Sequence, residues 1–485
     1  MKLMRMISTV LPRRLLINSA AIFGGEAIAR LATALMALVV ARFYGMDALG
    51  NYGYALALAS VLLIVPDFGL HLFAVRELSS LPQQLPEVFW NVHWLKFALT
   101  VAVTAFAMCF GAWGITDRER RVVFYILVLR VLLQSFSHAA MAVFKALERM
   151  HYIALQQSVN SAVTAVWVAG SLVMGVPLHL LVAGLVVGQL AETLIGWNIL
   201  GRLLSSSHFI KWDGKALRRM AAASFPFGVT AILLALNLRI DILVLSHYVS
   251  SRILGQFNAA AWFVVAMFLC ASLLMSVLFP RLSRVLAEPG GLGSDYIRSL
   301  VKNVLMFAAV GSLLLWSAAP GLIRVFFGPD FAPAAHILRI LSPSLPLVFL
   351  NTIFFYVFAA ARRRFVCLGT LSAGIGVGTL LSVYLSSHHG AAGAATADVA
   401  REFIMSGAYL CFLIQGNHAR FAGVALLKVF GVATALLLVS VRLAGMFHFH
   451  FMWLAAWMFF VLMGTLVTLG FPRIREWQLL TDDRR

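Results

Sequence analysis

Charged residues are scarce in this chain of 485 residues, of which Asp, Glu, Lys and Arg together make up 12%. A soluble globular protein has about 25% charged residues and is roughly half apolar, whereas 61% of this sequence is hydrophobic. The mean hydropathy is +0.91. This shortage of charge excludes an ordinary soluble domain and favours a protein whose surface lies in lipid.

Cysteine is also rare. All four cysteines, Cys109, Cys270, Cys367 and Cys411, fall within apolar runs. Their spacing fits neither a metal site nor a disulfide framework. We therefore interpret them as small packing residues, and we expect neither a bound metal nor another cofactor.

Long apolar runs are what the chain has in abundance. A helix needs about 20 apolar residues to cross the bilayer core, and the first run, 15–43, is too long for a signal peptide. We predict an all-α polytopic membrane protein with about 14 transmembrane helices. The predicted spans are 15–43, 50–73, 88–111, 121–146, 153–174, 178–203, 221–247, 255–286, 297–319, 334–361, 364–386, 391–415, 422–444 and 449–471.

The few charges are mostly basic, with 38 Lys and Arg against 19 Asp and Glu. On a soluble protein a net charge of +19 would suggest nucleic-acid binding. When the predicted spans are laid out, however, Lys and Arg favour the side that holds both termini by roughly three to one. This bias predicts that both termini are cytoplasmic. It assigns most of the charge to topology and to contact with anionic membrane lipids, so we expect no nucleic-acid partner.

Three segments recur in the same order at offsets of about 205 to 213 residues. The paired segments are ARFYGMDALGNYGYALA (41–57) with SHYVSSRILGQFNAAAW (246–262), ALERMHYIAL (146–155) with AAARRRFVCL (359–368), and GLVVGQLAE (184–192) with GAATADVAR (393–401). The recurrence predicts two pseudo-symmetric six-helix lobes with a cleft between them, where transporters bind their substrates. The predicted divisions are an N-lobe (1–204), a cytoplasmic linker (205–220), a C-lobe (221–415), and two C-terminal helices with a cytoplasmic tail (416–485).

A charge at mid-bilayer costs ~2.5–3.5 kcal/mol on insertion scales, so such residues face a protein interior or a wet cavity. The basic residues at membrane depth are Arg30, Lys96, Arg130, Arg239 and Arg401, and the acidic ones of interest are Glu26, Asp67, Asp241 and Asp398. Arg130 and Arg239 have no acid three or four residues away. We predict that the basic set binds an anionic pyrophosphate group, because Arg offers a planar fork of donors. The acidic set supplies ion-coupling candidates. The alternative is that each charge belongs to an internal ion pair, such as Glu26 with Arg30.

Three stretches resemble a known family of transporters: ARFYGMDALGNYGYALALASVLLIVPDFGL (41–70), NLRIDILVLSHYVSSRILGQFNAAAWF (237–263) and IRVFFGPDFAPAAHILRILSPSLP (323–346). They are similar to segments of the bacterial polysaccharide, or O-antigen type, flippases of the multidrug/oligosaccharidyl-lipid/polysaccharide (MOP) exporter superfamily. The resemblance implies a fourteen-helix, two-lobe fold in the bacterial inner membrane. It also implies alternating access that translocates an undecaprenyl-pyrophosphate-linked oligosaccharide, such as an O-antigen or exopolysaccharide repeat unit. Asp241 matches the Asp of the family's seventh span.

Two other functions stay open. A cation-coupled multidrug antiporter of the same superfamily would need surplus carboxylates in its cavity, and the charges at membrane depth are at best balanced. A membrane glycosyltransferase or polymerase would need a larger outer loop than the longest one predicted, 320–333. We therefore expect a monomeric transporter rather than an enzyme. The sequence leaves open whether H⁺ or Na⁺ is coupled to transport, and whether a polysaccharide polymerase is a partner.

Overall fold

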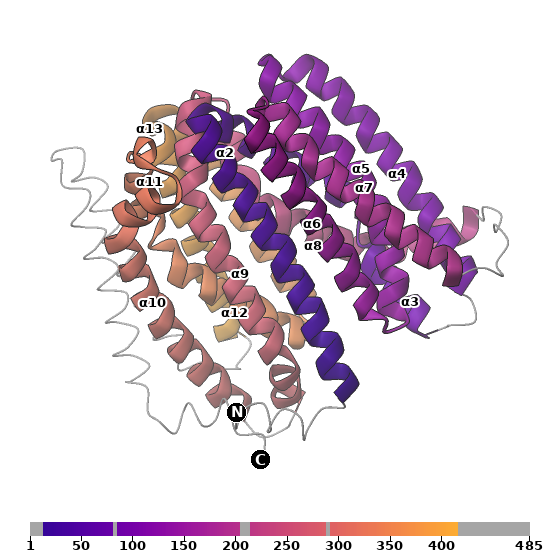
Figure 1. Ribbon diagram of the computed structural model, residues 1–485. Helices are drawn as coiled ribbons and strands as arrows, with labels where there is room; N and C mark the ends of the chain where they lie inside the picture. The colour runs from indigo at the N-terminus through magenta and orange to yellow at the C-terminus, as the bar shows by residue number, and fades with distance from the viewer. Residues whose placement is uncertain (1–12, 81–84, 204–213, 288–291, 416–485) are drawn as a thin grey trace. The chain divides into compact units, whose positions relative to one another are not determined.

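The computed structural model describes residues 13–80, 85–203, 214–287 and 292–415 (Figure 1). All regular structure within these residues is helical, which confirms the predicted all-α fold class. The elements in chain order are α2 (Arg13–Asp67), α3 (Leu70–Ser80), α4 (Leu85–Gly114), α5 (Arg118–Ala146), α6 (Met150–Met174), α7 (Leu178–Leu203), α8 (Gly214–Leu245), α9 (Ser251–Ala287), α10 (Leu292–Phe326), the 3-10 helix η2 (Pro329–Phe331), α11 (Ala334–Leu341), α12 (Ser344–Ala360) and α13 (Arg364–Gln415).

The predicted spans correspond closely to these helices. Most of the spans from 15–43 to 391–415 fall on one helix or on one arm of a broken helix. The span 50–73 instead crosses the break between α2 and α3, and 334–361 covers both α11 and α12. Within the described residues, eight helices are long and apolar enough to cross a membrane, or nine if the bent pair α11 and α12 forms one span. The last two predicted spans, 422–444 and 449–471, lie outside the described residues. The protein is thus a polytopic helical membrane protein.

Contacts between helices divide the chain into two compact units, Met1–Leu243 and Val244–Arg485. Nearly all of α8 therefore belongs to the first unit. α8 begins at Gly214, inside the predicted linker 205–220. The helix therefore starts several residues before the predicted span 221–247. The lobe boundaries that we derived from the sequence repeats stay a prediction.

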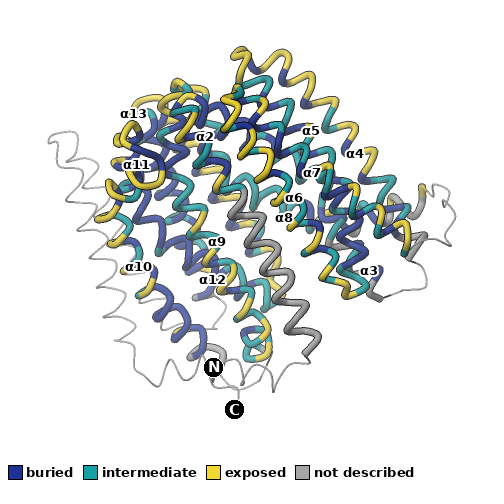
Figure 2. Tube along the Cα trace, in the orientation of Figure 1, coloured by how far each residue is buried: buried dark blue, intermediate teal, exposed yellow. Residues whose placement is uncertain are grey.

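The first unit is built around α5. This helix contacts α2, α3, α4 and α7, while α6 packs against α2 and α7. Leu70, Phe89, Phe144, Ile153 and Leu200 are among the buried residues of a hydrophobic cluster that joins these helices. Buried polar residues of α2, α4, α5 and α8 lie within this unit. Figure 2 shows in dark blue where the chain is buried.

The second unit has α12 at its centre. α12 packs against α9, α10 and α13, and α11 contacts the same three helices. The core includes Leu300, Ile353, Phe354 and Tyr409, each at most 1% exposed. α12 is therefore covered by α9, α10 and α13.

Glycines in the left-handed region mark comparable turns in both units. Gly45 (φ 83°) breaks α2, Gly390 (φ 55°) breaks α13, and Gly175 (φ 61°) ends α6. Residues with a Cβ rarely adopt this conformation. In the first unit the Tyr44 hydroxyl donates to the Val176 carbonyl at 2.6 Å. In the second, Val249 lies beside Gly390. Each unit thus has two of its turns close to one another, and the duplication that the sequence repeats indicate stays a prediction.

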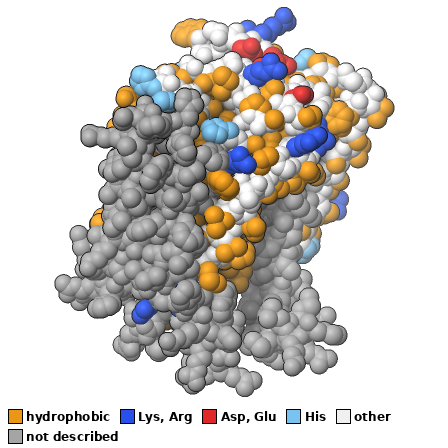
Figure 3. Space-filling view, turned by 90° about the vertical axis from the view of Figure 1, so that its left-hand side faces the viewer, with side chains coloured by type: hydrophobic (Ala, Val, Ile, Leu, Met, Phe, Trp, Pro, Cys, Tyr) orange, Lys and Arg blue, Asp and Glu red, His pale blue; other side chains and the backbone are white. Residues whose placement is uncertain are grey.

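The surface is apolar while several polar groups are buried. Trp113 is 91% exposed and Phe365 is 89% exposed, whereas Gln156 is fully buried and Glu192 is 4% exposed. Figure 3 shows hydrophobic side chains over much of the described part of one face, with acidic side chains gathered toward one end. This distribution fits a protein that is solvated by lipid.

Candidate functional site

Two arginines lie near one buried tyrosine in the first unit. Tyr52, on the second arm of α2, is fully buried, and its hydroxyl has no hydrogen-bond partner among the described residues. Arg130 on α5 and Arg239 on α8 both act electrostatically on that hydroxyl. Groups from α2, α5 and α8 are therefore within electrostatic range of one another.

Neither Arg130 nor Arg239 forms an ion pair within the described part of the chain. The Arg130 Nε atom is buried and has no acceptor there. A guanidinium in a low-dielectric interior that lacks an acceptor carries a large desolvation cost. Within the described residues, neither group would have to break an ion pair to meet an anion.

A second polar cluster lies between α2, α3, α4 and α5. The Lys96 Nζ atom donates to Asp67 Oδ1 at 2.5 Å. Beside this pair, the Lys145 Nζ atom lies 3.0 Å from His71 Nε2, and the rings of His71 and His138 are 6.0 Å apart.

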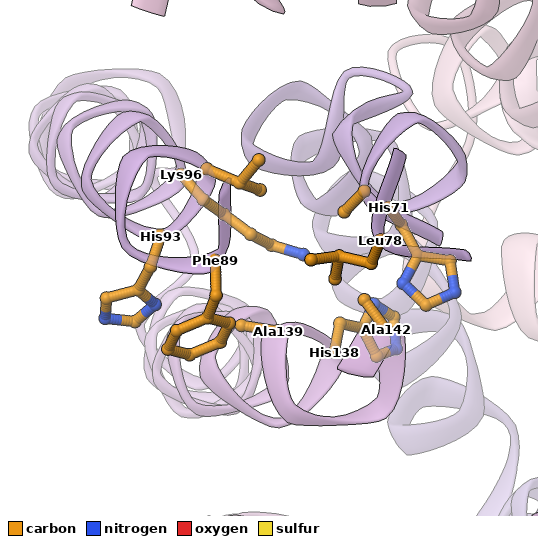
Figure 4. A pocket seen from close by; sticks show the side chains of 10 residues that line it. His71, Leu78, Phe89, His93, Lys96, His138, Ala139 and Ala142 are labelled. Atoms are coloured by element: carbon orange, nitrogen blue, oxygen red, sulfur yellow. The ribbon is translucent and has the colours of Figure 1, made fainter. Parts of the chain in front are cut away.

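A small pocket lies within this cluster, lined by His71, His93, Lys96 and His138 together with apolar side chains. Figure 4 shows the Lys96 side chain reaching from α4 toward the side on which His71 and His138 lie. Among the described residues, no group of His, Cys, Asp and Glu could hold a metal ion. The pocket therefore joins titratable groups without offering a metal site.

A third network surrounds the carboxylate of Glu192 on α7. Ser137 Oγ donates to its Oε1 atom at 2.5 Å, and Asn160 Nδ2 donates to its Oε2 atom at 2.5 Å. Gly188 lies one turn before Glu192, and a Cβ there would come within 2.8 Å of the Asn160 carbonyl. The glycine lets α6 approach closely enough for Asn160 to reach the carboxylate.

In the second unit, Arg401 is surrounded by carboxylates. It pairs with Asp398 on the preceding turn and lies 3.6 Å from Glu402 Oε1. Glu402 in turn accepts from Asn351 Nδ2 at 2.9 Å. The side chain of Arg401 is 4% exposed. This geometry corresponds to the alternative of an internal ion pair, so it lends no support to head-group binding by Arg401 or to ion coupling by Asp398.

For the remaining predicted site residues, Asp241, Glu26 and Arg30, the structure gives fewer contacts. Asp241 is 7% exposed and Asn237 is 8% exposed, one turn apart on α8, as their spacing predicts. Asp241 has an interaction partner, so it is not a free carboxylate. Glu26 and Arg30 lie in α2, but their side chains are outside what the structure describes. The functional roles assigned to all nine predicted residues stay predictions.

Sequence reasoning did not select three participants that the structure brings into these sites. Tyr52 stands in a recurring segment, but its type is ordinary for the end of a membrane span. Lys145 stands at the cytoplasmic end of the predicted span 121–146, where the charge bias leads us to expect basic residues, yet it contacts His71. Glu192 is visible as an acid in an apolar run, but its donors come from two other helices.

Comparison with known proteins places the chain in a family. A family model described as "Polysaccharide biosynthesis protein" matches residues 15–286, which is more than half of the sequence. The chain belongs to this polysaccharide biosynthesis protein family. The membership confirms the resemblance to polysaccharide exporters that the three sequence stretches indicated. No curated protein sequence matches the chain.

Solved structures share the fold of this polysaccharide biosynthesis protein at low sequence identity. The lipid II flippase MurJ in an inward closed conformation is 14% identical with a TM-score of 0.69, covering 93% of this chain and 98% of its own. An inward-facing multidrug resistance MATE family transporter of the MOP superfamily is 12% identical with a TM-score of 0.62, covering 80% and 94%. A MOP superfamily transporter from Pyrococcus furiosus is 13% identical with a TM-score of 0.54, covering 83% and 94%. The fold is that of the MOP superfamily.

Proposed function

We propose that this protein carries an oligosaccharide linked to undecaprenyl pyrophosphate from the cytoplasmic to the outer leaflet of the bacterial inner membrane by alternating access. The observation that carries the proposal is the pair of guanidinium groups, Arg130 and Arg239, within electrostatic range of the buried Tyr52 hydroxyl. Membership of a polysaccharide biosynthesis family supports the glycan. The fold shared with the lipid II flippase MurJ supports a lipid-linked substrate.

The chemistry of these three side chains suits a pyrophosphate group. Each guanidinium presents five N–H donors in a planar fork and stays charged when it is desolvated. Phosphate oxygens accept such bonds in bidentate pairs. The hydroxyl of Tyr52 adds one more donor, and it lacks a partner among the described residues. The oxygens of a pyrophosphate would supply the hydrogen-bond acceptors that these donors lack among the described residues.

A cation-coupled multidrug antiporter is the main alternative, because MATE transporters share the fold. The charge near Tyr52 argues against a cationic substrate there, since Arg130 and Arg239 would repel it. A membrane glycosyltransferase is less consistent with the chain between α10 and α11. That connection runs only from Phe327 to Pro333, and Asp330 is its one acid.

Other parts of the proposal come from the sequence. Cytoplasmic termini follow from the distribution of Lys and Arg. Coupling to H⁺ or Na⁺ through Asp67, Asp241 or Glu26 belongs to the proposal, as does a polysaccharide polymerase that consumes the translocated unit. Because the pyrophosphate is the same on every substrate, the arginines would serve any glycan, and other residues would select among sugars.

The test is translocation by purified full-length protein in proteoliposomes. A fluorescent undecaprenyl-pyrophosphate oligosaccharide is placed in both leaflets, and a membrane-impermeant quencher reports how fast the inner pool becomes accessible. The variants are Arg130→Gln, Arg239→Gln and their combination. The matched control is Arg252→Gln, at an exposed arginine at the start of α9.

We expect each single variant to slow translocation by about 10- to 100-fold, the equivalent of one charged hydrogen-bonded contact. Arg252→Gln should behave like the wild type. Wild-type rates from the Arg130→Gln/Arg239→Gln double variant would show that these guanidinium groups do not bind the head group. Efflux of a cationic dye from the same liposomes would instead favour the antiporter.

A further inference from the structure

The turn between α12 and α13, residues 361–363, joins two helices of the second unit that are apolar enough to cross a membrane. α13 meets this criterion alone, and α12 meets it together with α11. The end of a membrane-crossing helix lies at the depth of the lipid headgroups. The bias of Lys and Arg predicts that this end of the second unit faces the cytoplasm. Side chains of the turn are thus positioned to meet headgroups of the cytoplasmic leaflet.

Three consecutive arginines and one phenylalanine form an exposed basic patch at this turn. The patch consists of Arg362, Arg363, Arg364 and Phe365, all of which are exposed, and Phe365 is 89% exposed. The sequence contains no Asp or Glu from 331 to 397, so no acid nearby in the chain balances the three guanidinium groups. A phenyl ring is stabilised when it leaves water, and the membrane interface offers apolar surroundings to such a ring.

The backbone of the turn does not require a basic sequence, because the turn between α5 and α6 has the same conformation. Each turn has three successive backbone hydrogen bonds, which reach carbonyls four, three and five residues earlier in that order. The middle donor residue of each turn has a positive φ, 56° at Glu148 and 58° at Arg362. In the first unit the four positions of the basic patch are occupied by Glu148, Arg149, Met150 and His151. The patch is therefore not a condition for forming the turn.

Helix α13 gains no stability from a cation at its start. The helix begins at Arg364, and its first turn contains no acidic residue. The N-terminus of a helix carries a partial positive charge, so a cation in the first turn is unfavourable. An anionic group from outside the chain would offset this repulsion. The arginines of the basic patch are therefore better explained by an anionic ligand than by the fold.

A phospholipid satisfies both parts of the basic patch. Its phosphate lies at headgroup depth and accepts paired hydrogen bonds from guanidinium groups. Its acyl chains begin at the boundary where an interfacial phenyl ring is buried. Clusters of Lys and Arg beside a membrane helix attract anionic lipids, because these lipids carry the net negative charge that the cluster neutralises. The chemistry of the patch thus favours an anionic phospholipid over a soluble anion, which would leave Phe365 exposed to water.

We propose that Arg362, Arg363, Arg364 and Phe365 form a binding site for one anionic phospholipid of the cytoplasmic leaflet. The arginines hold the headgroup phosphate, and the ring of Phe365 packs beside the acyl chains. The bound lipid offsets the positive charge at the start of α13 and anchors the α12–α13 turn at the membrane surface. The site uses residues of the second unit alone, and it does not depend on the proposed transport function.

Native mass spectrometry of the full-length protein in detergent tests the site. The protein is titrated with phosphatidylglycerol and, separately, with phosphatidylcholine that has the same acyl chains. The variants are Arg362→Gln/Arg363→Gln/Arg364→Gln and Phe365→Ser. The matched control, Arg118→Gln/Arg121→Gln/Arg252→Gln, also removes three charges, near the starts of α5 and α9, which are predicted to face away from the cytoplasm. Melting temperatures without added lipid verify that each variant is folded.

We expect the triple variant of the basic patch to weaken the tightest phosphatidylglycerol binding by about 100-fold, because each basic residue near a membrane surface contributes a factor of about five. Phe365→Ser should weaken it several-fold, and the matched control should bind like the wild type. Phosphatidylcholine should bind the wild type more weakly than phosphatidylglycerol does. Equal losses in the patch variant and the control, or equal binding of the two lipids by the wild type, would overturn the proposal. Phosphatidylglycerol binding that the patch variant leaves unchanged would also overturn it, and would favour an acidic protein partner instead.

Discussion

Lys96 and Asp67 form an ion pair across 2.5 Å that joins α4 to the end of α2 inside the first unit. The Lys96 side chain is 4% exposed and that of Asp67 is 29% exposed. Lys96 also anchors a neighbouring contact, because its backbone carbonyl accepts from Thr100, whose hydroxyl meets that of Ser135 on α5. The ion pair joins α4 to α2, and the Thr100–Ser135 contact joins α4 to α5. Together they hold three helices near the C-terminal end of α2.

Replacing Lys96 by Met should destabilise the protein by about 1 to 3 kcal/mol, because it leaves a partly buried carboxylate without its cation. The combination Lys96→Met/Asp67→Asn should recover much of that loss. Thermal unfolding in detergent, followed by tryptophan fluorescence, measures both. Equal melting temperatures for Lys96→Met and the wild type would mean that the pair adds nothing to stability.

The Glu192 network predicts that stability depends on whether the side chain at position 192 can accept hydrogen bonds. Glu192→Gln should cost less than about 1 kcal/mol, because the amide oxygen can accept from Asn160 while the Ser137 hydroxyl reverses and accepts from the amide. Glu192→Leu should cost about 1 to 3 kcal/mol for each donor that it leaves without an acceptor. The same thermal unfolding assay compares the two, and a milder effect of Leu than of Gln would contradict the hydrogen-bond assignment.

Arg401 and the arginines near Tyr52 should respond differently to substitution. Arg401→Gln should lower stability by about 3 to 5 kcal/mol, because Asp398 and Glu402 then remain buried without a cation. Arg130→Gln and Arg239→Gln should leave stability unchanged or improved while they slow translocation, because neither has an ion pair to lose in the described chain. Protein yield and melting temperature, measured beside translocation, separate the two groups. Slowed translocation by stable Arg401→Gln protein would restore Arg401 as a binding candidate.

Gly69 is expected to be the least replaceable glycine of the first unit. Gly69→Ala combines a φ of 72° with a Cβ 2.6 Å from that of Phe227, so we expect a loss of more than about 1 kcal/mol. Gly170→Ala is the control, because that glycine is exposed on α6 and a Cβ there meets nothing within 4 Å. The control should gain up to about 1 kcal/mol from better helix propensity. A tolerated Gly69→Ala would show that the chain between α2 and α3 is looser than its contacts indicate.

The sequence alone determined the class of the protein and the positions of its helices. A span of about 20 apolar residues has essentially one stable form in lipid, because every backbone polar group must be satisfied within the segment. That constraint is local, so runs such as 121–146 and 178–203 predicted α5 and α7 almost to the residue. The scarcity of charge also identified the few residues worth examining, because burying each one is costly.

Only the tertiary structure decided what those charges do. The acids that Arg401 meets, Asp398 and Glu402, are its neighbours in the sequence. Arg130 has no such neighbour, and the sequence could not tell whether a carboxylate from another helix reaches it; among the described residues none does. A guanidinium's partner on another helix is chosen by the rotation and spacing of packed helices, which depend on contacts far apart in the chain. The pairing of Lys145 with His71, 74 residues away, has the same origin. Local apolar pattern determined the helices, and long-range packing determined which charges meet a partner among the described residues.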